Sequence, residues 1–307
     1  MIPKSYNKNG IELSRLGLGC MRLSMTMTGA SVDKNESIKT IHRALDLGIN
    51  LLNTGDFYAD GENEKLIAES LKGVDRDKAF ISLKYGTFSN MMTGGPIDVG
   101  PKNVKKYLTD SLRRLNVDYV DLYQPARIDV GIPLEETIGA ISDLVDAGYV
   151  KHIGLSEVDA ATLRKAHEVH PISLVESVYS IIDNTVEAEV LPTARELGIG
   201  VVAFGLMGLG KLSKQENDPL MHTMKEIINE KEITLSQLAH AWILSKGEDI
   251  IPLVGARNIS QLDDSVKSVA VDLKKDDILR LEDAIAKSQL VGPSMPKLVI
   301  RNGILER

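Results

Sequence analysis

Eight short runs rich in Val, Ile and Leu recur along the chain, and longer amphipathic segments separate them. Each run is continuously apolar rather than alternating, which is typical of parallel strands that helices cover. We expect strands at residues 16–19, 50–53, 79–84, 119–124, 152–156, 174–177, 200–204 and 250–254. Eight repeats of a strand followed by a helix predict an α/β fold, a closed (β/α)8 barrel.

The segments between the runs have the spacing of helices that end in glycine. We expect helices at 37–47, 135–147 and 187–197, each followed directly by a glycine, which is a common helix stop. Asn9-Gly10 predicts an N-terminal β-hairpin that covers one end of the barrel. Residues 274–286 predict an extra C-terminal helix, and because no linker divides the chain we expect residues 1–307 to form a single domain.

An open, doubly wound sheet is the competing architecture, and it would require a phosphate-binding glycine fingerprint after the first strand. Gly17 and Gly19 begin such a pattern, but Arg22 stands where close helix packing needs Gly or Ala. The fingerprint therefore fails, and the barrel is favoured. In a barrel of this kind the chemistry lies at the carboxyl ends of the strands.

Charge and cysteine usage exclude several classes of partner. The 36 Lys and Arg residues against 43 Asp and Glu give a net charge of -7, which disfavours nucleic acid as a partner. Cys20 is the only cysteine, so a reducing cytoplasmic location is the simplest expectation. No stretch approaches the roughly 18 uncharged residues of a membrane helix, and the N-terminus lacks a secretory apolar core.

Two local patterns resemble ligand motifs without satisfying them. His167 and His170 are three residues apart, not four as in a helical zinc motif, so we predict no metal site. The loop from Gly205 to Lys211 has the spacing of a phosphate loop, but Leu212 occupies the position of the magnesium-binding Ser or Thr. We interpret it as a glycine-rich loop at the barrel mouth that can still cradle a phosphate through its N–H groups.

Tyr58 and Lys84 follow the second and third predicted strands, so a closed barrel brings both to one mouth. A phenol has a pKa of about 10 in solution, and a neighbouring ammonium favours its ionised form. The pair therefore indicates a Tyr58 hydroxyl that donates a proton to a carbonyl oxygen. A packed tyrosine and a salt-bridged lysine are the alternative interpretation of the spacing alone.

Five blocks of sequence, in order and at strand ends, resemble those of the aldo-keto reductase superfamily over nearly the whole chain. The blocks are Asn53-Thr54-Gly55-Asp56-Phe57-Tyr58-Ala59-Asp60-Gly61-Glu62-Asn63-Glu64, Ile153-Gly154-Leu155-Ser156, Tyr179-Ser180, Ala203-Phe204-Gly205-Leu206-Met207-Gly208-Leu209-Gly210 and Ile251-Pro252-Leu253-Val254-Gly255-Ala256. The superfamily's catalytic tetrad is Asp, Tyr, Lys and His, and the resemblance places Tyr58 and Lys84 at two of its positions.

The chain departs from this tetrad at the other two positions, where Asn53 replaces the Asp and Ala126 replaces the His. Asn53 retains an acceptor for the Lys84 ammonium but deletes a negative charge, which should make the Tyr58 phenol more acidic. Gln124 or Arg127 is a candidate to replace the missing imidazole as a donor to the substrate carbonyl. A purely structural role is the alternative for both residues.

The resemblance implies NADPH as the cofactor. It assigns cofactor-binding positions to Ser156, Glu157, Glu176, Phe204, Gly205, Leu206, Gly208, Gly255, Arg257, Gln261, Asp264 and Ser265. Within this set, Ser156, Glu157 and Glu176 correspond to positions that hold the nicotinamide carboxamide, and Phe204 to a Tyr that stacks on the ring. Arg257 is the expected bidentate donor to the 2′-phosphate that distinguishes NADPH from NADH.

The sequence therefore predicts an NADPH-dependent reductase that converts a small-molecule aldehyde or ketone to an alcohol. The combination of Asn53 and Tyr58 with Pro125-Ala126-Arg127 is similar to the pyridoxal reductase branch, which makes pyridoxal the leading specific substrate. Two alternatives stay open. An NADPH-binding regulatory subunit does not need the Tyr58–Lys84 pair, and a barrel lyase or isomerase does not need the Ser156 and Arg257 positions.

Overall fold

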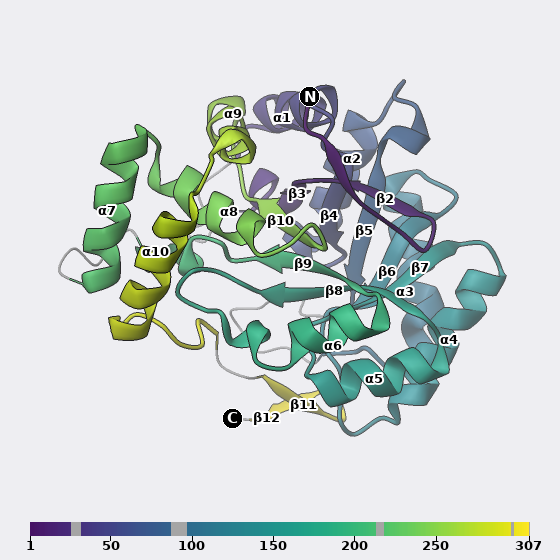
Figure 1. Cartoon of the computed structure of the whole chain (residues 1–307). Helices are drawn as coiled ribbons and strands as arrows, with labels where there is room; N and C mark the ends of the chain where they lie inside the picture. The colour runs from purple at the N-terminus through teal and green to yellow at the C-terminus, as the bar shows by residue number, and fades with distance from the viewer. Residues whose placement is uncertain (26–31, 87–96, 213–217, 296–297, 307) are drawn as a thin grey trace.

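Eight parallel strands close into a barrel in the computed structural model of the chain (Figure 1). The structure describes residues 1–25, 32–86, 97–212, 218–295 and 298–306. Around the barrel the order is β10 (Ile250–Val254), β3 (Gly17–Gly19), β4 (Leu51–Gly55), β5 (Phe80–Tyr85), β6 (Val120–Pro125), β7 (Val150–Ser156), β8 (Ile172–Val178) and β9 (Gly200–Phe204). The predicted (β/α)8 barrel and its eight strands are confirmed.

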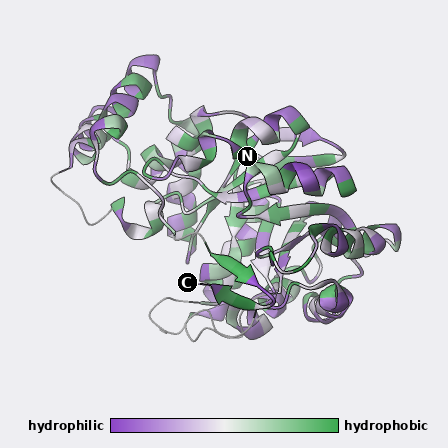
Figure 2. Cartoon of the chain, turned by 90° about the horizontal axis from the view of Figure 1, so that it is seen from below, coloured by the Kyte–Doolittle hydropathy of each residue, from purple (hydrophilic) through white to green (hydrophobic). Residues whose placement is uncertain are grey.

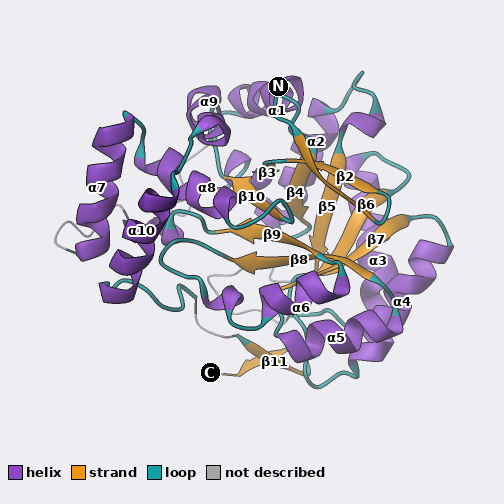
Figure 3. Ribbon diagram, in the orientation of Figure 1, coloured by secondary structure: helices purple, strands orange, loops and turns teal. Residues whose placement is uncertain are grey.

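Helices surround the strands as an outer layer (Figure 3). They are α1 (Lys34–Asp46), α2 (Glu62–Ser70), α3 (Pro101–Leu115), α4 (Leu134–Asp146), α5 (Ala160–Val169), α6 (Val190–Leu197), α7 (Pro219–Lys231), α8 (Leu235–Ser245), α9 (Ile259–Val266) and α10 (Lys275–Lys287). Among the described residues, no helix is long and apolar enough to span a membrane.

Two helices begin several residues away from the predicted start, because local contacts before each helix determine its first turn. Helix α1 begins three residues earlier than predicted because the Asp33 carboxylate accepts hydrogen bonds from the backbone N–H groups of Asn35 and Glu36. The helix predicted at 187–197 begins only at Val190, since residues Thr185–Glu187 form a separate 3₁₀ turn. The predicted glycine stop is confirmed there, because Gly198 ends α6 with a φ of 71°.

An N-terminal hairpin closes the amino end of the barrel. Strands β1 (Lys4–Lys8) and β2 (Ile11–Ser14) pair antiparallel through a turn in which both Asn9 and Gly10 have positive φ. The hairpin contributes Tyr6, Ile11 and Leu13 to one apolar cluster with residues that point into the barrel. Its other members are Leu51, Leu122, Leu174, Val202, Ile251 and Leu253. The predicted covering hairpin is thus present.

The barrel interior changes from apolar to polar along its axis. Side chains two residues apart on one strand share a face, so Leu51 and Asn53 both face inward on β4. The same step leads from Leu122 to Gln124 on β6 and from Leu174 to Glu176 on β8, and all three polar residues are buried. Polar side chains therefore collect at the carboxyl end, above the apolar cluster.

The segment between β9 and β10 holds two helices, α7 and α8, and α10 follows α9, so the helices exceed the eightfold pattern. The predicted C-terminal helix is observed as α10, and it packs against α7 beside the barrel (Figure 1), where Arg280 forms ion pairs with Glu226 and Glu230. Helix α8 carries Trp242, which is fully buried and lies edge-on to Tyr179 with 5.9 Å between ring centroids. Trp242 is therefore a packing residue of the outer layer of helices.

A second hairpin, which the sequence did not predict, ends the chain. Strands β11 (Val299–Arg301) and β12 (Ile304–Glu306) carry several hydrophobic residues (Figure 2) and contact the segment after β6. The buried Asp129 carboxylate accepts hydrogen bonds from the backbone N–H groups of Asn302 and Gly303 at 2.8 and 2.6 Å. This carboxylate fixes the hairpin to the carboxyl-end face of the barrel.

Asp129→Ala should release the C-terminal hairpin. Loss of a charged acceptor leaves backbone donors unpaired, so we expect a loss of about 2 kcal/mol in unfolding free energy. The expected readouts are urea unfolding and faster hydrogen exchange at the Asn302 and Gly303 amides. Asp143→Ala, on the exposed face of α4, is the control. Unchanged protection of both amides would show that Asp129 does not hold the hairpin.

Candidate active site

Four polar side chains meet inside the carboxyl end of the barrel. The Lys84 ammonium donates to Asn53 Oδ1 at 2.6 Å and to the two Glu176 carboxylate oxygens at 2.9 and 3.1 Å. Asn53 Nδ2 and Gln124 Nε2 donate to Glu176 Oε2 at 2.7 and 2.8 Å. All four residues are buried, so this is a charged network in a low-dielectric interior.

Tyr58 lies beside this network. The Lys84 Nζ atom is 5.4 Å from the centroid of the Tyr58 ring, and only 8% of Tyr58 is exposed. Burial opposes the charge on Lys84, but the Glu176 carboxylate and the Tyr58 hydroxyl more than compensate and raise the pKa of Lys84 above its usual value. Lys84 is therefore a stable ammonium next to a phenol.

The structure corrects the expected acidity of Tyr58. The sequence predicted a more acidic phenol because Asn53 carries no charge to offset Lys84. Burial instead raises the pKa of Tyr58, Lys84 lowers it, and the Glu176 carboxylate raises it again, with a net increase. The expectation was wrong mainly because Tyr58 is buried, and in addition because Glu176, a residue far away in the sequence, carries the negative charge that position 53 lacks.

A strained loop presents Tyr58 at the end of β4. The two residues after Tyr58, Ala59 and Asp60, both have left-handed φ values, of 50° and 52°, which is uncommon for residues other than glycine. Phe57 packs edge-on to the Tyr58 ring with centroids 4.8 Å apart. Gly55 leaves room for this arrangement, since a Cβ there would lie 3.0 Å from the Phe57 ring.

Asn63 anchors the same loop, and sequence reasoning did not single it out. Its side chain is fully buried, accepts a hydrogen bond from Thr54 Oγ1, and donates to the Cys20 carbonyl and to Ser24 Oγ, each at 2.7 Å. These bonds link the start of α2 to β4 and to the 3₁₀ turn that follows β3. The signal available in the sequence was its place in the polar block that follows Tyr58.

The two candidates for the missing imidazole occupy different environments. Gln124 has no exposed surface, and its Nε2 already donates to Glu176. Arg127 lies beyond the end of β6, is partly exposed, and donates to the Ala126 carbonyl at 2.6 Å. Ala126 itself is buried and offers no polar atom on its side chain. Arg127 is therefore the candidate with surface available to a substrate.

The expected contacts of the nicotinamide end lie on β7, β8 and β9. Ser156 ends β7 directly beside Glu176 in the strand register, and the Glu157 carboxylate accepts from the Val178 backbone N–H at 2.7 Å. Burial is the main cause of a raised pKa for Glu157. Phe204 ends β9 and is partly buried.

The glycine-rich loop that follows β9 packs closely enough to require its glycines. Gly205 and Gly208 have φ values of 72° and 58°, and a Cβ on Gly208 would meet the Ile182 side chain at 2.1 Å. Leu206, between them, is buried. The predicted loop at the barrel mouth is thus observed, with one turn of 3₁₀ helix at Gly208–Gly210.

The predicted phosphate-binding segment surrounds the start of α9, after Gly255. Gln261 Oε1 accepts from the Arg257 backbone N–H at 3.0 Å and so shapes the turn before the helix. The Asp264 carboxylate accepts from Thr234 and from Gln237, which ties α9 to α8, and the neighbouring Ser265 is buried. Arg257 itself is exposed.

Arg22, in the 3₁₀ turn Cys20–Leu23 that follows β3, is a second arginine near this segment. The sequence analysis assigned no cofactor-binding role to it. Burial and the charge of Arg257 both lower the pKa of Arg22, so the two guanidiniums lie close enough to repel each other. Neither forms an ion pair with a carboxylate among the residues that the structure describes. The sequence signal that could have identified Arg22 was its position in the turn that follows the first barrel strand.

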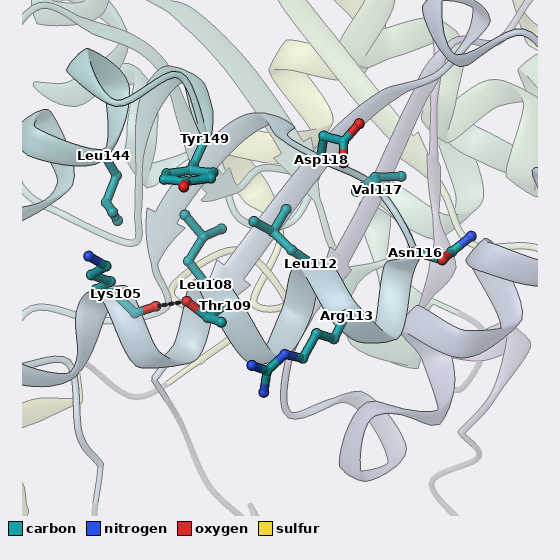
Figure 4. Close-up of a pocket in the computed structure, with 10 residues that line it drawn as sticks. All are labelled: Lys105, Leu108, Thr109, Leu112, Arg113, Asn116, Val117, Asp118, Leu144 and Tyr149. Carbon is teal, nitrogen blue, oxygen red and sulfur yellow. Dashed lines mark hydrogen bonds between the residues drawn. The ribbon is translucent and has the colours of Figure 1, made fainter.

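Two other features are a thiol beside the site and a groove on the outer surface. Burial raises the pKa of the Cys20 thiol to about 12, so we interpret this buried residue as an uncharged packing side chain. A groove of about 380 Å³ lies on the outer surface beside α3, and Figure 4 shows its lining residues, including Leu108, Leu112 and Tyr149. None of the barrel-lumen residues lines it.

The closed barrel, the polar network in its lumen and the adjacent Tyr58–Lys84 pair together define a (β/α)8 barrel protein with a candidate active site at the carboxyl ends of its strands. The aldo/keto reductase family model matches residues 15–286. A probable aldo-keto reductase of Glycine max is 34% identical, with 94% of this chain and 90% of the relative covered. The chain belongs to the aldo/keto reductase family, and is thus an oxidoreductase that reduces carbonyl groups with a nicotinamide cofactor.

Solved structures agree with this family. A thermostable aldo-keto reductase in complex with the inhibitor epalrestat superposes with a TM-score of 0.81 at 26% identity, covering 92% of this chain and 100% of that one. An aldo-keto reductase from Bacillus halodurans, in its holo form, gives a TM-score of 0.77 at 26% identity, covering 92% and 96%.

Asp56, between β4 and Tyr58, should make stability depend on pH. Burial raises the pKa of its carboxyl to about 7. A raised folded-state pKa means that stability is complete below the unfolded value, about 4, and declines as the pH rises toward 7, by up to about 1.4 kcal/mol per pH unit. Asp56→Asn should remove this decline.

The measurement is urea unfolding of wild type and Asp56→Asn between about pH 4 and about pH 8, with the difference between the two proteins as the readout. Asp46→Asn, exposed at the end of α1, serves as the control because it removes a carboxylate from the surface and not from the buried site. A difference that stays constant with pH would contradict burial of an ionising Asp56.

Proposed function

We propose that the protein is an NADPH-dependent reductase of aldehydes or ketones in which Tyr58 donates a proton to the carbonyl oxygen. The buried Tyr58 beside the Lys84 ammonium carries this proposal. Because its pKa is raised, the phenol holds its proton at neutral pH. The adjacent ammonium then stabilises the phenolate that remains when the proton leaves.

The described residues offer a fitting site for a dinucleotide phosphate. Arg22 and Arg257 repel each other and lack carboxylate partners among the described residues, so a bound phosphate group would relieve an unfavourable arrangement. Ser156 and Glu157 would hold the nicotinamide end, and Phe204 offers an aromatic face to the ring. When bound, NADPH would supply the hydride that reduces the carbonyl carbon.

Arg257→Ala should narrow the preference of the protein for NADPH over NADH. The guanidinium can bind the 2′-phosphate, which NADH lacks, so we expect NADPH affinity to fall by about tenfold or more, with NADH affinity changed by less than about threefold. Fluorescence titration with both cofactors measures this. Arg113→Ala on α3, far from the barrel mouth, is the matched control. Equal affinities of the wild type for both cofactors would refute the proposal.

Tyr58→Phe should abolish aldehyde reduction and leave NADPH binding nearly intact. The hydroxyl donates its proton in the transition state and is not needed to hold the cofactor, so kcat should fall by at least about a hundredfold. Steady-state assays and cofactor titration on the same preparation separate the two effects. A variant that keeps most of its kcat would remove Tyr58 from the mechanism.

For the substrate we propose a pyridoxal-type aldehyde, supported by the combination of Asn53 and Tyr58 with Pro125-Ala126-Arg127. Arg127 is partly exposed beyond β6, and we propose that it orients the carbonyl in place of the missing imidazole. A panel of pyridoxal, aliphatic and aromatic aldehydes tests this. Tight NADPH binding with no turnover on any of them would favour a regulatory subunit instead.

A further inference from the structure

The carboxylate that neutralises Lys84 comes from the opposite side of the barrel. In the closed order of strands, β8 lies four positions from β4 and three from β5. Glu176 on β8 nevertheless contacts both Lys84 on β5 and Asn53 on β4, across the lumen. The resemblance noted for the tetrad would instead place the carboxylate on β4, at position 53.

The hydrogen bonds show that the amide of Asn53 complements the carboxylate of Glu176. Asn53 Oδ1 accepts from Lys84 while its Nδ2 donates to Glu176 Oε2, so the amide uses both of its polar atoms. An aspartate at position 53 has no donor for Glu176 and would set two buried carboxylates against each other. An aspartate there would require a neutral donor, such as glutamine, at position 176.

We propose that Glu176 is the positioning residue that keeps Lys84 charged and oriented beside Tyr58, and that Asn53 and Glu176 form an exchanged charge pair. Here the carboxylate stands on β8 and the neutral amide on β4, whereas the tetrad noted above has its carboxylate on β4. This inference rests on the proposed role of Tyr58 as the proton donor. It replaces the expectation that Glu176 holds the nicotinamide carboxamide.

The direction of the electrostatic effect follows from the charges around the pair. Removing the Glu176 charge makes both Tyr58 and Lys84 release protons more readily, so their coupled first deprotonation moves to lower pH. The other titratable groups whose charges affect this network are Cys20, directly after β3, and Glu157, directly after β7. Both remain unchanged in the variants below.

The experiment compares wild type with Glu176→Gln, Asn53→Asp and the double variant that carries both changes. The readouts are kcat/KM for an aldehyde at saturating NADPH from about pH 6 to about pH 10, the NADPH dissociation constant, and the melting temperature. Isotopically labelled cofactor confirms that chemistry limits the rate. Asp121→Asn, which removes a buried carboxylate from ion pairs with Arg76 and Lys151 outside the barrel, is the control for lost stability.

Glu176→Gln should lower kcat by about tenfold or more, with NADPH affinity changed by less than about threefold. The alkaline limb, which is the fall of kcat/KM at high pH, should shift to lower pH by about one unit. Asn53→Asp should shift the limb to higher pH. The double variant restores one carboxylate and one amide around Lys84, so it should regain most of the kcat and the wild-type limb. Asp121→Asn should leave the limb in place.

An unshifted limb in Glu176→Gln, or a double variant no better than Glu176→Gln, would overturn the exchanged pair. If Glu176→Gln does not fold, the comparison of the double variant with wild type decides: a shared alkaline limb supports the inference and a displaced one refutes it. Failure of the proposed function gives a separate result. Tyr58→Phe would then retain activity, wherever the alkaline limb of the Glu176 variants lies.

Discussion

The Lys84–Glu176 ion pair is the interaction on which the barrel mouth depends. An ammonium with 4% exposure is stable only if a carboxylate and further hydrogen bonds compensate its lost hydration. Glu176 supplies the charge, and Asn53 and Gln124 satisfy its remaining lone pairs. Because these residues lie on β4, β5, β6 and β8, the network also joins strands that are not neighbours in the sheet.

The rest of the molecule serves to keep this network dry and Tyr58 beside it. The N-terminal hairpin covers the amino end of the lumen with Tyr6, Ile11 and Leu13, so an apolar layer lies between that end and the charged layer. At the other end, Asn63 and the left-handed residues after Tyr58 hold the phenol in place. The C-terminal hairpin, fixed by Asp129, adds a further wall at the carboxyl-end face.

Tyr58 combines a raised pKa with a neighbouring cation, and the two features have different roles in a reduction. Burial keeps the phenol protonated until a substrate arrives, whereas the Lys84 ammonium lowers the cost of losing that proton. The Glu176 carboxylate offsets part of the effect of Lys84 on the pKa of Tyr58, which suits the proton donation proposed for this residue.

The sequence by itself determined the eight strands, most helix positions, the N-terminal hairpin and the meeting of Tyr58 with Lys84. These depend on local periodicity, glycine stops and the rule that parallel strands end at one mouth. Tertiary structure alone decided the C-terminal hairpin, the proximity of Arg22 to Arg257, and the contact of Glu176 with Lys84. Residues 84 and 176 lie 92 positions apart, and local pattern carries no information on which side chains meet across a lumen. The acidity of Tyr58 was therefore predicted in the wrong direction, because burial and a distant carboxylate set it.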